Sequence, residues 1–111
     1  MLSFVRPPDR APAQAGWCVK LHVQVTDSAE NPCMRDTRCV RFEVGGPAEI
    51  VGVDNGNLTE PTPYASASVP LWLGGASVVV RLRGTPGTVA VRALAEKLRP
   101  AACTLNVETV I

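Results

Sequence analysis

The sequence predicts an all-β chain folded as a sandwich of about seven antiparallel strands in two sheets. Short segments in which apolar and polar residues alternate recur along the chain, and a period of two is typical of half-buried strands. Gly, Pro and Asn separate these segments at short intervals, as turns do. No long stretch has the i, i+3, i+4 apolar spacing of a helix.

Length and composition bound the classes of function. The 111 residues are enough for one domain with one modest core, and 46% apolar content is typical of a folded domain. A net charge of +1 with scattered arginines argues against a nucleic-acid partner. No apolar run approaches the roughly 18 residues of a membrane span. The apolar start of the chain reaches Arg6 too soon for a secretion signal. The sequence therefore does not give the location, and a periplasmic or secreted one stays open.

The chain divides into a lead-in and a domain. Residues 1–16 contain three prolines among Ala, Gln and Gly, which predicts a linker or an irregular lead-in. Trp17 directly precedes the first strand pattern, so we place the β-domain at residues 17–111.

The expected strands follow from their alternation. In residues 19–26, Val19, Leu21 and two further valines face one way, while polar residues including His22 face the other. We expect residues 84–87 to form a hairpin turn. The other expected strands are residues 39–44, 48–53, 69–73, 77–83, 88–95 and 102–110.

The strongest local signal is the turn that ends the apolar run Ile50–Val53. Asp54, Asn55 and Gly56 follow, and Asn-Gly favours a tight turn because both residues tolerate positive φ. The Asp54 side chain is expected to accept a hydrogen bond from the turn backbone. Gly52, inside the run, indicates a bulge or a close backbone approach.

The segment Phe42–Asn57, FEVGGPAEIVGVDNGN, resembles a known block. This block, F-x-V-x-G-x-[GA]-x-[IL]-x-G-V-D-N-G-[DN], occurs in a C-terminal immunoglobulin-like domain of glycoside hydrolase family 2 enzymes of the β-galactosidase type. Residues 19–32 also resemble the V-x-V-x-D-x-x-G-N-P start of bacterial immunoglobulin-like modules. The resemblance covers about residues 19–107 and implies an immunoglobulin-like sandwich.

The resemblance also implies a function and partners. In such enzymes the glycosidase carboxylates lie on a separate barrel domain, so this chain would be a non-catalytic accessory domain whose partners are the remaining domains. Residues 57–70 form a long, proline-rich connection, and connections of this length are often functional. Shaping substrate access is the role that we expect for it. Ala65 stands where the resembling loop has a basic residue.

The residues themselves offer no catalytic site, metal site or cofactor site. Glycoside hydrolysis needs two carboxylic groups about 5–10 Å apart. Glu43 and Glu49 alternate with apolar residues and are expected to face solvent, whereas Asp54 serves the turn. The single histidine, His22, lies on a polar strand face without a nearby cysteine or second histidine in sequence.

Two alternatives to an accessory domain stay open. An independent carbohydrate-binding module would use Tyr64, Trp72 or Trp17 to stack on sugar rings, although the same residues suit contacts between domains. An immunoglobulin-like stalk or adhesin module is the second alternative, and the lack of an internal repeat argues against it. Exposed edge strands would also allow a homodimer.

Four cysteines, Cys18, Cys33, Cys39 and Cys103, allow three pairings into two disulfides. Cys33 and Cys39 flank a short loop, and Cys18 and Cys103 start the first and last expected strands, which would be neighbours in a disulfide-linked pair. We expect four reduced thiols, with Cys103 buried on an apolar face.

Overall fold

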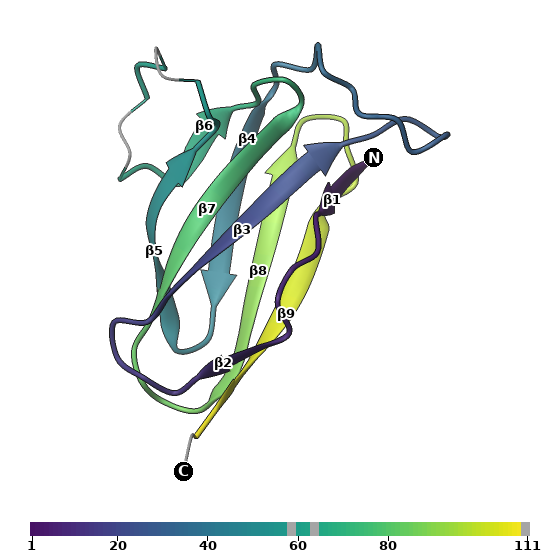
Figure 1. The fold of residues 1–111 in the computed structure, drawn as a ribbon. Helices are drawn as coiled ribbons and strands as arrows, with labels where there is room; N and C mark the ends of the chain where they lie inside the picture. The colour runs from purple at the N-terminus through teal and green to yellow at the C-terminus, as the bar shows by residue number, and fades with distance from the viewer. Residues whose placement is uncertain (58–59, 63–64, 110–111) are drawn as a thin grey trace.

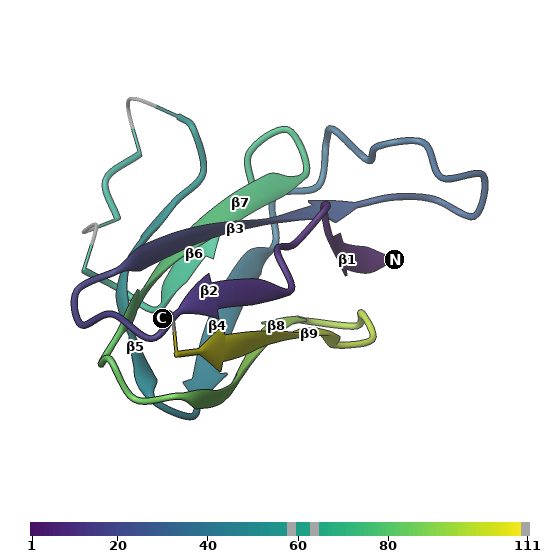
Figure 2. The same cartoon turned by 60° about the horizontal axis from the view of Figure 1, so that its bottom comes forward.

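The structure, a computed structural model, describes residues 1–57, 60–62 and 65–109. Within these residues nine strands form two sheets packed face to face, which confirms the predicted all-β, immunoglobulin-like sandwich (Figures 1 and 2). The described residues include no helix long and apolar enough to cross a membrane. The strands are β1 (Leu2–Phe4), β2 (Arg10–Pro12), β3 (Cys18–Val25), β4 (Cys39–Gly45), β5 (Ala48–Asp54), β6 (Ser68–Pro70), β7 (Gly75–Leu82), β8 (Gly87–Ala95) and β9 (Ala101–Glu108).

The strands are divided between sheet A, in the order β1-β3-β7-β5, and sheet B, in the order β2-β9-β8-β4-β6. Among the described strands only β2 and β9 pair in parallel. Figure 2 shows β3 and β7 in one layer above β8 and β9 in the other. Because strand side chains alternate, the inner faces of the two layers form the core. Its largest fully buried side chains are Phe42, Leu21, Leu71, Leu82 and Leu105.

Residues 1–16 correct the expectation of a linker or irregular lead-in, because they contribute β1 and β2. Leu2–Phe4 pairs with the end of β3, and Arg10–Pro12 runs beside the end of β9. Leu2 and Ala11 are buried in the core. Strands of three residues are too short to show a periodicity, so composition alone indicated an irregular segment.

Residues 84–87 are not the expected hairpin turn. They carry the chain from β7 in sheet A to β8 in sheet B, whereas β8 and β9 are the neighbours that pair. Alternation predicts the two faces of a strand but not its partner, because the partner is selected by long-range packing.

A β-bulge interrupts β5, as Gly52 indicated. Ile50 pairs with Val80 and Gly52 pairs with Val79, so Val51 is the extra residue. Bulges twist an edge strand, and β5 forms one edge of sheet A. The other sheet edges are three-residue strands, and both features oppose pairing between the edges of two molecules.

All four cysteines are free thiols in the structure. Cys18 begins β3 in sheet A and Cys103 lies in β9 in sheet B, so the idea that their strands are neighbours is wrong. Cys103 packs against the core, and its burial raises the pKa of the thiol.

Candidate functional site

Three of the connecting segments at one end of the sandwich, the top of Figure 1, pack against one another. They are residues 26–38 between β3 and β4, the segment that follows β5, and the turn between β6 and β7. We call this the apical end. The links between β4 and β5 and between β7 and β8 lie at the opposite end.

The segment after β5 is the Asp-Asn-Gly turn. Gly56 has a φ of 85°, a conformation that glycine adopts without strain. Asp54 Oδ1 accepts a hydrogen bond from the N–H of Gly56 at 3.0 Å, and Asn55 Oδ1 accepts one from the N–H of Asn57 at 2.9 Å. Both side chains therefore stabilise the turn that their own backbone makes.

Asn55 also joins the ends of two strands. Its side chain is buried, and its Nδ2 donates to the carbonyl oxygen of Pro70 at 2.9 Å and to Glu60 Oε1 at 3.2 Å. Glu60 Oε2 accepts from Thr62 Oγ1 at 2.7 Å, and the hydrogen bonds from Thr62 and Asn55 hold the pKa of the Glu60 carboxyl below its ordinary value. This network, which we call the Asn55 clamp, fixes the base of the long connection between β5 and β6.

The turn between β6 and β7 presents two large apolar side chains. Trp72 and Gly75 exchange two backbone hydrogen bonds of 3.0 Å, and the residues between them, Leu73 and Gly74, have φ values of 53° and 76°. Two successive residues with positive φ define a type I′ turn. Trp72 is 41% exposed and Leu73 is 46% exposed.

This turn is locked between its two neighbours. The Trp72 ring lies over Gly56, with ring carbons 3.5 Å from the point that a Cβ there would occupy. On the other side Gly74 lies against the backbone of Cys33, so closely that a Cβ would collide with it. Gln24 Nε2 donates to the carbonyl of Leu73 at 3.2 Å. The apical segments therefore form one packed unit.

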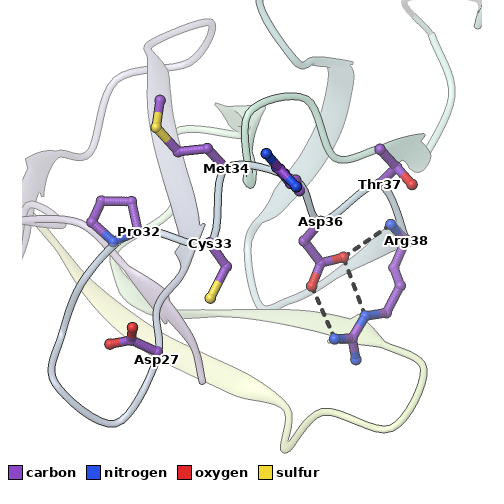
Figure 3. Close-up of a pocket in the computed structure, with 8 residues that line it drawn as sticks. Asp27, Pro32, Cys33, Met34, Asp36, Thr37 and Arg38 are labelled. Atoms are coloured by element: carbon purple, nitrogen blue, oxygen red, sulfur yellow. Dashed lines mark hydrogen bonds and ion pairs between the residues drawn. The ribbon is translucent and has the colours of Figure 1, made fainter.

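Asp27 and residues 32–38 line an open hollow of about 800 Å³ (Figure 3). Asp36 and Arg38 form an ion pair of 2.9 Å, and Arg38 Nη1 also donates to the carbonyl of Glu96 at 2.8 Å. Figure 3 shows that Cys33 and Met34 point in opposite directions, and Met34 is 56% exposed. The charges of Asp36 and Arg38 are thus paired with each other, whereas Arg35, which also lines the hollow, is exposed, as is the apolar side chain of Met34.

The aromatic residues that the sequence singled out do not gather at one site. Trp17 is half-exposed beside Leu82, whereas Trp72 adjoins Gly75 at the other end of β7. Seven steps of about 3.4 Å along an antiparallel strand separate the two ends by about 24 Å. One sugar ring is too small to contact both tryptophans. Tyr64 lies outside the described residues.

The candidate carboxylates on the strands are held in ion pairs. Glu43 in sheet B pairs with Arg41 and Arg92, each at 3.4 Å. Glu49 in sheet A pairs with Arg81 at 2.8 Å, and this guanidinium lowers the pKa of the Glu49 carboxyl. The two carboxylates belong to different sheets, which is not the arrangement of two groups that flank one sugar.

Other polar groups at the outer face of sheet A are also engaged. His22 Nδ1 lies 2.9 Å from Ser77 Oγ, its cross-strand partner, and Asp54 Oδ2 lies 3.9 Å from Lys20 Nζ. Among residues 1–57, 60–62 and 65–109, no group of three or more His, Cys, Asp or Glu is arranged to hold a metal ion.

Sequence reasoning missed two exposed apolar residues at the apical end, Leu73 and Met34. Leu73 was read as part of a short apolar segment, and its exposure results from the type I′ turn. Met34 follows Asn31-Pro32-Cys33 in a loop, and a single apolar residue inside a loop is the one signal that could have identified it.

These features define a class of protein, a β-sandwich domain that exposes packed loops and apolar side chains at one end. A model of glycoside hydrolase family 2 C-terminal domain 5 matches residues 9–104, and the chain belongs to this family. The resemblance seen in the sequence is therefore confirmed.

Relatives place this domain within longer chains. The chain is 33% identical over 86 residues to the β-galactosidase BoGH2A of Bacteroides ovatus, which covers 78% of this chain and 10% of that protein. A family 2 member from Bacteroides cellulosilyticus matches with a TM-score of 0.90 at 23% identity, over 95% of this chain and 14% of that one. A β-glycosidase from Bacteroides vulgatus matches with a TM-score of 0.85 at 23% identity, over 96% and 14% of the two chains. The chain thus spans 10–14% of these relatives.

Proposed function

We propose that this chain is a non-catalytic accessory domain of a longer family 2 glycoside hydrolase of the β-galactosidase type, and that it packs against the remaining domains. The observation that carries the proposal is the family match over residues 9–104 together with the small share of each relative that the chain covers. A partner surface is therefore expected within the same polypeptide.

The carboxylates support a non-catalytic role. A glycosidase requires one carboxyl group to donate a proton and a second to act as nucleophile or base. Glu43 and Glu49 are ion-paired on different sheets. Asp54 accepts a hydrogen bond from Gly56 within the Asp-Asn-Gly turn, and Glu60 accepts one from Thr62 in the Asn55 clamp. The hydrolytic pair is expected on another domain.

The long connection between β5 and β6 is the part that we propose to influence substrate access. The bond from Asn55 to Pro70 ties the start of this connection to the last residue of β6, so the connection begins at a fixed base. Ser66 Oγ, near the second end, donates to the carbonyl of Ser68 at 3.0 Å. Closed loops with such a base are often functional.

The test compares two substrates in the full-length enzyme. Deleting residues 58–68 should leave kcat/KM for a short aryl galactoside within about twofold, because chemistry takes place on another domain. Turnover of a long oligosaccharide should change about fivefold or more, which corresponds to roughly 1 kcal/mol. The matched control replaces Thr85 by glycine in the link at the opposite end. Unchanged kinetics on both substrates would sink the access role, and hydrolysis by the isolated chain would sink the non-catalytic role.

Carbohydrate binding by this domain is a second candidate function, favoured by the half-exposed Trp72. Trp72 is the bridge partner of Gly75, so its ring lies on the face that also carries His22. An NMR titration of the isolated chain with galactosides should move the indole N–H of Trp72 and not that of Trp17. Uniformly small shifts at both indoles would rule this candidate out.

A further inference from the structure

Exposed apolar side chains gather at the apical end. Among the described residues, the exposed large apolar side chains are Met1, Val5, Trp17, Met34, Trp72 and Leu73. Trp72, Leu73 and Met34 belong to neighbouring segments of the packed apical unit. Adjoining exposed apolar groups typically mark contact surfaces, whereas single ones are ordinary.

These three exposed side chains stand on adjoining loops, and we call the set the apical ridge. Gly74, next to Leu73, packs against Cys33, next to Met34. The N–H of Val25 donates to the carbonyl of Gly74 at 2.9 Å, and the N–H of Cys33 donates to the carbonyl of Val25 at 2.8 Å. Backbone hydrogen bonds through β3 therefore hold both loops, and a rigid surface loses little conformational entropy on binding.

We infer that the apical ridge of Trp72, Leu73 and Met34 is the surface by which this domain contacts another domain of its own polypeptide. The inference rests on the proposed accessory function and specifies its contact surface. Chains that contain this domain are much longer than it, since the match covers 10% of one relative and 14% of another. Such a chain supplies a large protein surface at a fixed, high effective concentration.

The chemistry of the ridge favours a protein partner over other occupants. A sugar would stack on Trp72, but Leu73 and Met34 can neither stack on a ring nor bond its hydroxyls. Residues 26–38, the loop that carries Met34, contain three carboxylates against two arginines, so they lack the cluster of cations that binds an anionic lipid surface. An apolar patch on a neighbouring domain would bury all three ridge side chains.

The opposite end lacks a comparable surface. Trp17 stands there without a second exposed large apolar side chain among the described residues of that end. Cys18 pairs across the strands with Arg81, whose guanidinium is bound to Glu49. Because no contact is expected at that end, residues 84–87 are an internal control for the hydrogen-exchange comparison below.

The experiment compares hydrogen exchange in the full-length polypeptide with exchange in this chain alone. Peptides covering residues 32–36 and 71–75 should exchange at least fivefold more slowly in the full-length protein, because the contact excludes water from both loops. Peptides covering residues 15–18 and 84–87 should exchange at the same rate in both.

Two substitutions test the side chains themselves. Leu73→Asp and Met34→Asp in the full-length protein should abolish the added protection, while Val5→Asp, at a similarly exposed position off the ridge, should preserve it. Aspartate tolerates the positive φ of position 73, so the isolated L73D chain should melt within a few degrees of the parent chain.

The outcomes separate the inference from the function on which it rests. Added protection confined to residues 15–18 and 84–87 refutes the ridge as the contact surface but leaves the accessory role in place. Equal exchange everywhere overturns both. Ridge-dependent self-association of the isolated chain, or a ridge-localised response to galactosides, overturns the inference if the full-length protein shows no added protection.

Discussion

Replacing Asn55 by alanine tests how the apical end is held together. The substitution removes the Nδ2 bonds to the carbonyl of Pro70 and to Glu60, and the Oδ1 bond from the N–H of Asn57. Asn55 is only 8% exposed, so water does not fully replace these partners. The change disconnects the end of β5 from the end of β6.

The magnitude follows from the number of hydrogen bonds. Each contributes about 1 kcal/mol net, and the bond to Glu60 is weaker because Glu60 is partly exposed to water. We expect Asn55→Ala to lower the free energy of unfolding by about 2–3 kcal/mol, which corresponds to roughly 9–13 °C in Tm for a domain of this size. Asn55→Asp keeps the Oδ1 acceptor but places a carboxylate against the Pro70 carbonyl and Glu60. At neutral pH it should destabilise at least as much as alanine.

Urea unfolding of the isolated chain at 25 °C and pH 7, followed by tryptophan fluorescence, measures these differences if the m-value stays constant. Asn106→Ala, on the exposed face of β9, is the matched control and should change the free energy of unfolding by less than about 0.5 kcal/mol. If Asn55→Ala unfolds within that same margin of the parent chain, the reasoning about the Asn55 clamp is refuted.

Three further predictions concern single positions. Gly46→Ala should cost about 2 kcal/mol or more in urea unfolding, because φ is 97° and a Cβ would collide with a β8 carbonyl. Gly45→Ala meets nothing within 4 Å and should cost clearly less; equal costs would contradict the steric argument. The lowered pKa of Glu60 stabilises the fold above its ordinary value of 4.5, and this stability is lost as pH falls through the lowered pKa. Glu60→Gln should therefore reduce the change in the urea midpoint between pH 5 and pH 3. If the midpoint of the variant falls with pH as steeply as that of the parent chain, this linkage is excluded. Burial raises the pKa of Cys103, so iodoacetamide at pH 8 should alkylate it roughly tenfold more slowly than exposed Cys39 by mass spectrometry; equal rates would show that Cys103 is accessible.

Local patterns predicted the strands that carry the core. The alternation in residues 19–26 matches β3, whose valines and Leu21 are buried while Lys20 and His22 face solvent. Gly52 predicted the bulge of β5, since a residue without a side chain weakens a regular strand. These signals are readable because they depend on neighbouring residues only.

The candidate site was predictable only in part. Asn55 and Gly56 were identified as turn residues from the Asn-Gly pair, but the bond from Asn55 to Pro70 spans a long connection and leaves no local trace. The exposure of Leu73 depends on a turn that falls at Leu73-Gly74, so it includes the last residue of the expected strand 69–73. That position is set by the pairing of Trp72 with Gly75.

The sequence by itself determined the all-β class, the faces of the main strands, the Asp-Asn-Gly turn and the resemblance to a C-terminal domain of family 2 enzymes. These properties follow from periodicity and turn chemistry, which act over a few residues. Only the tertiary structure decided that residues 1–16 add two strands, that β7 and β8 belong to different sheets, and that Trp17 and Trp72 lie at opposite ends. It also brought the backbone of Cys33 against Gly74. Such contacts join segments far apart in the chain, and their free energy comes from packing that no local pattern encodes.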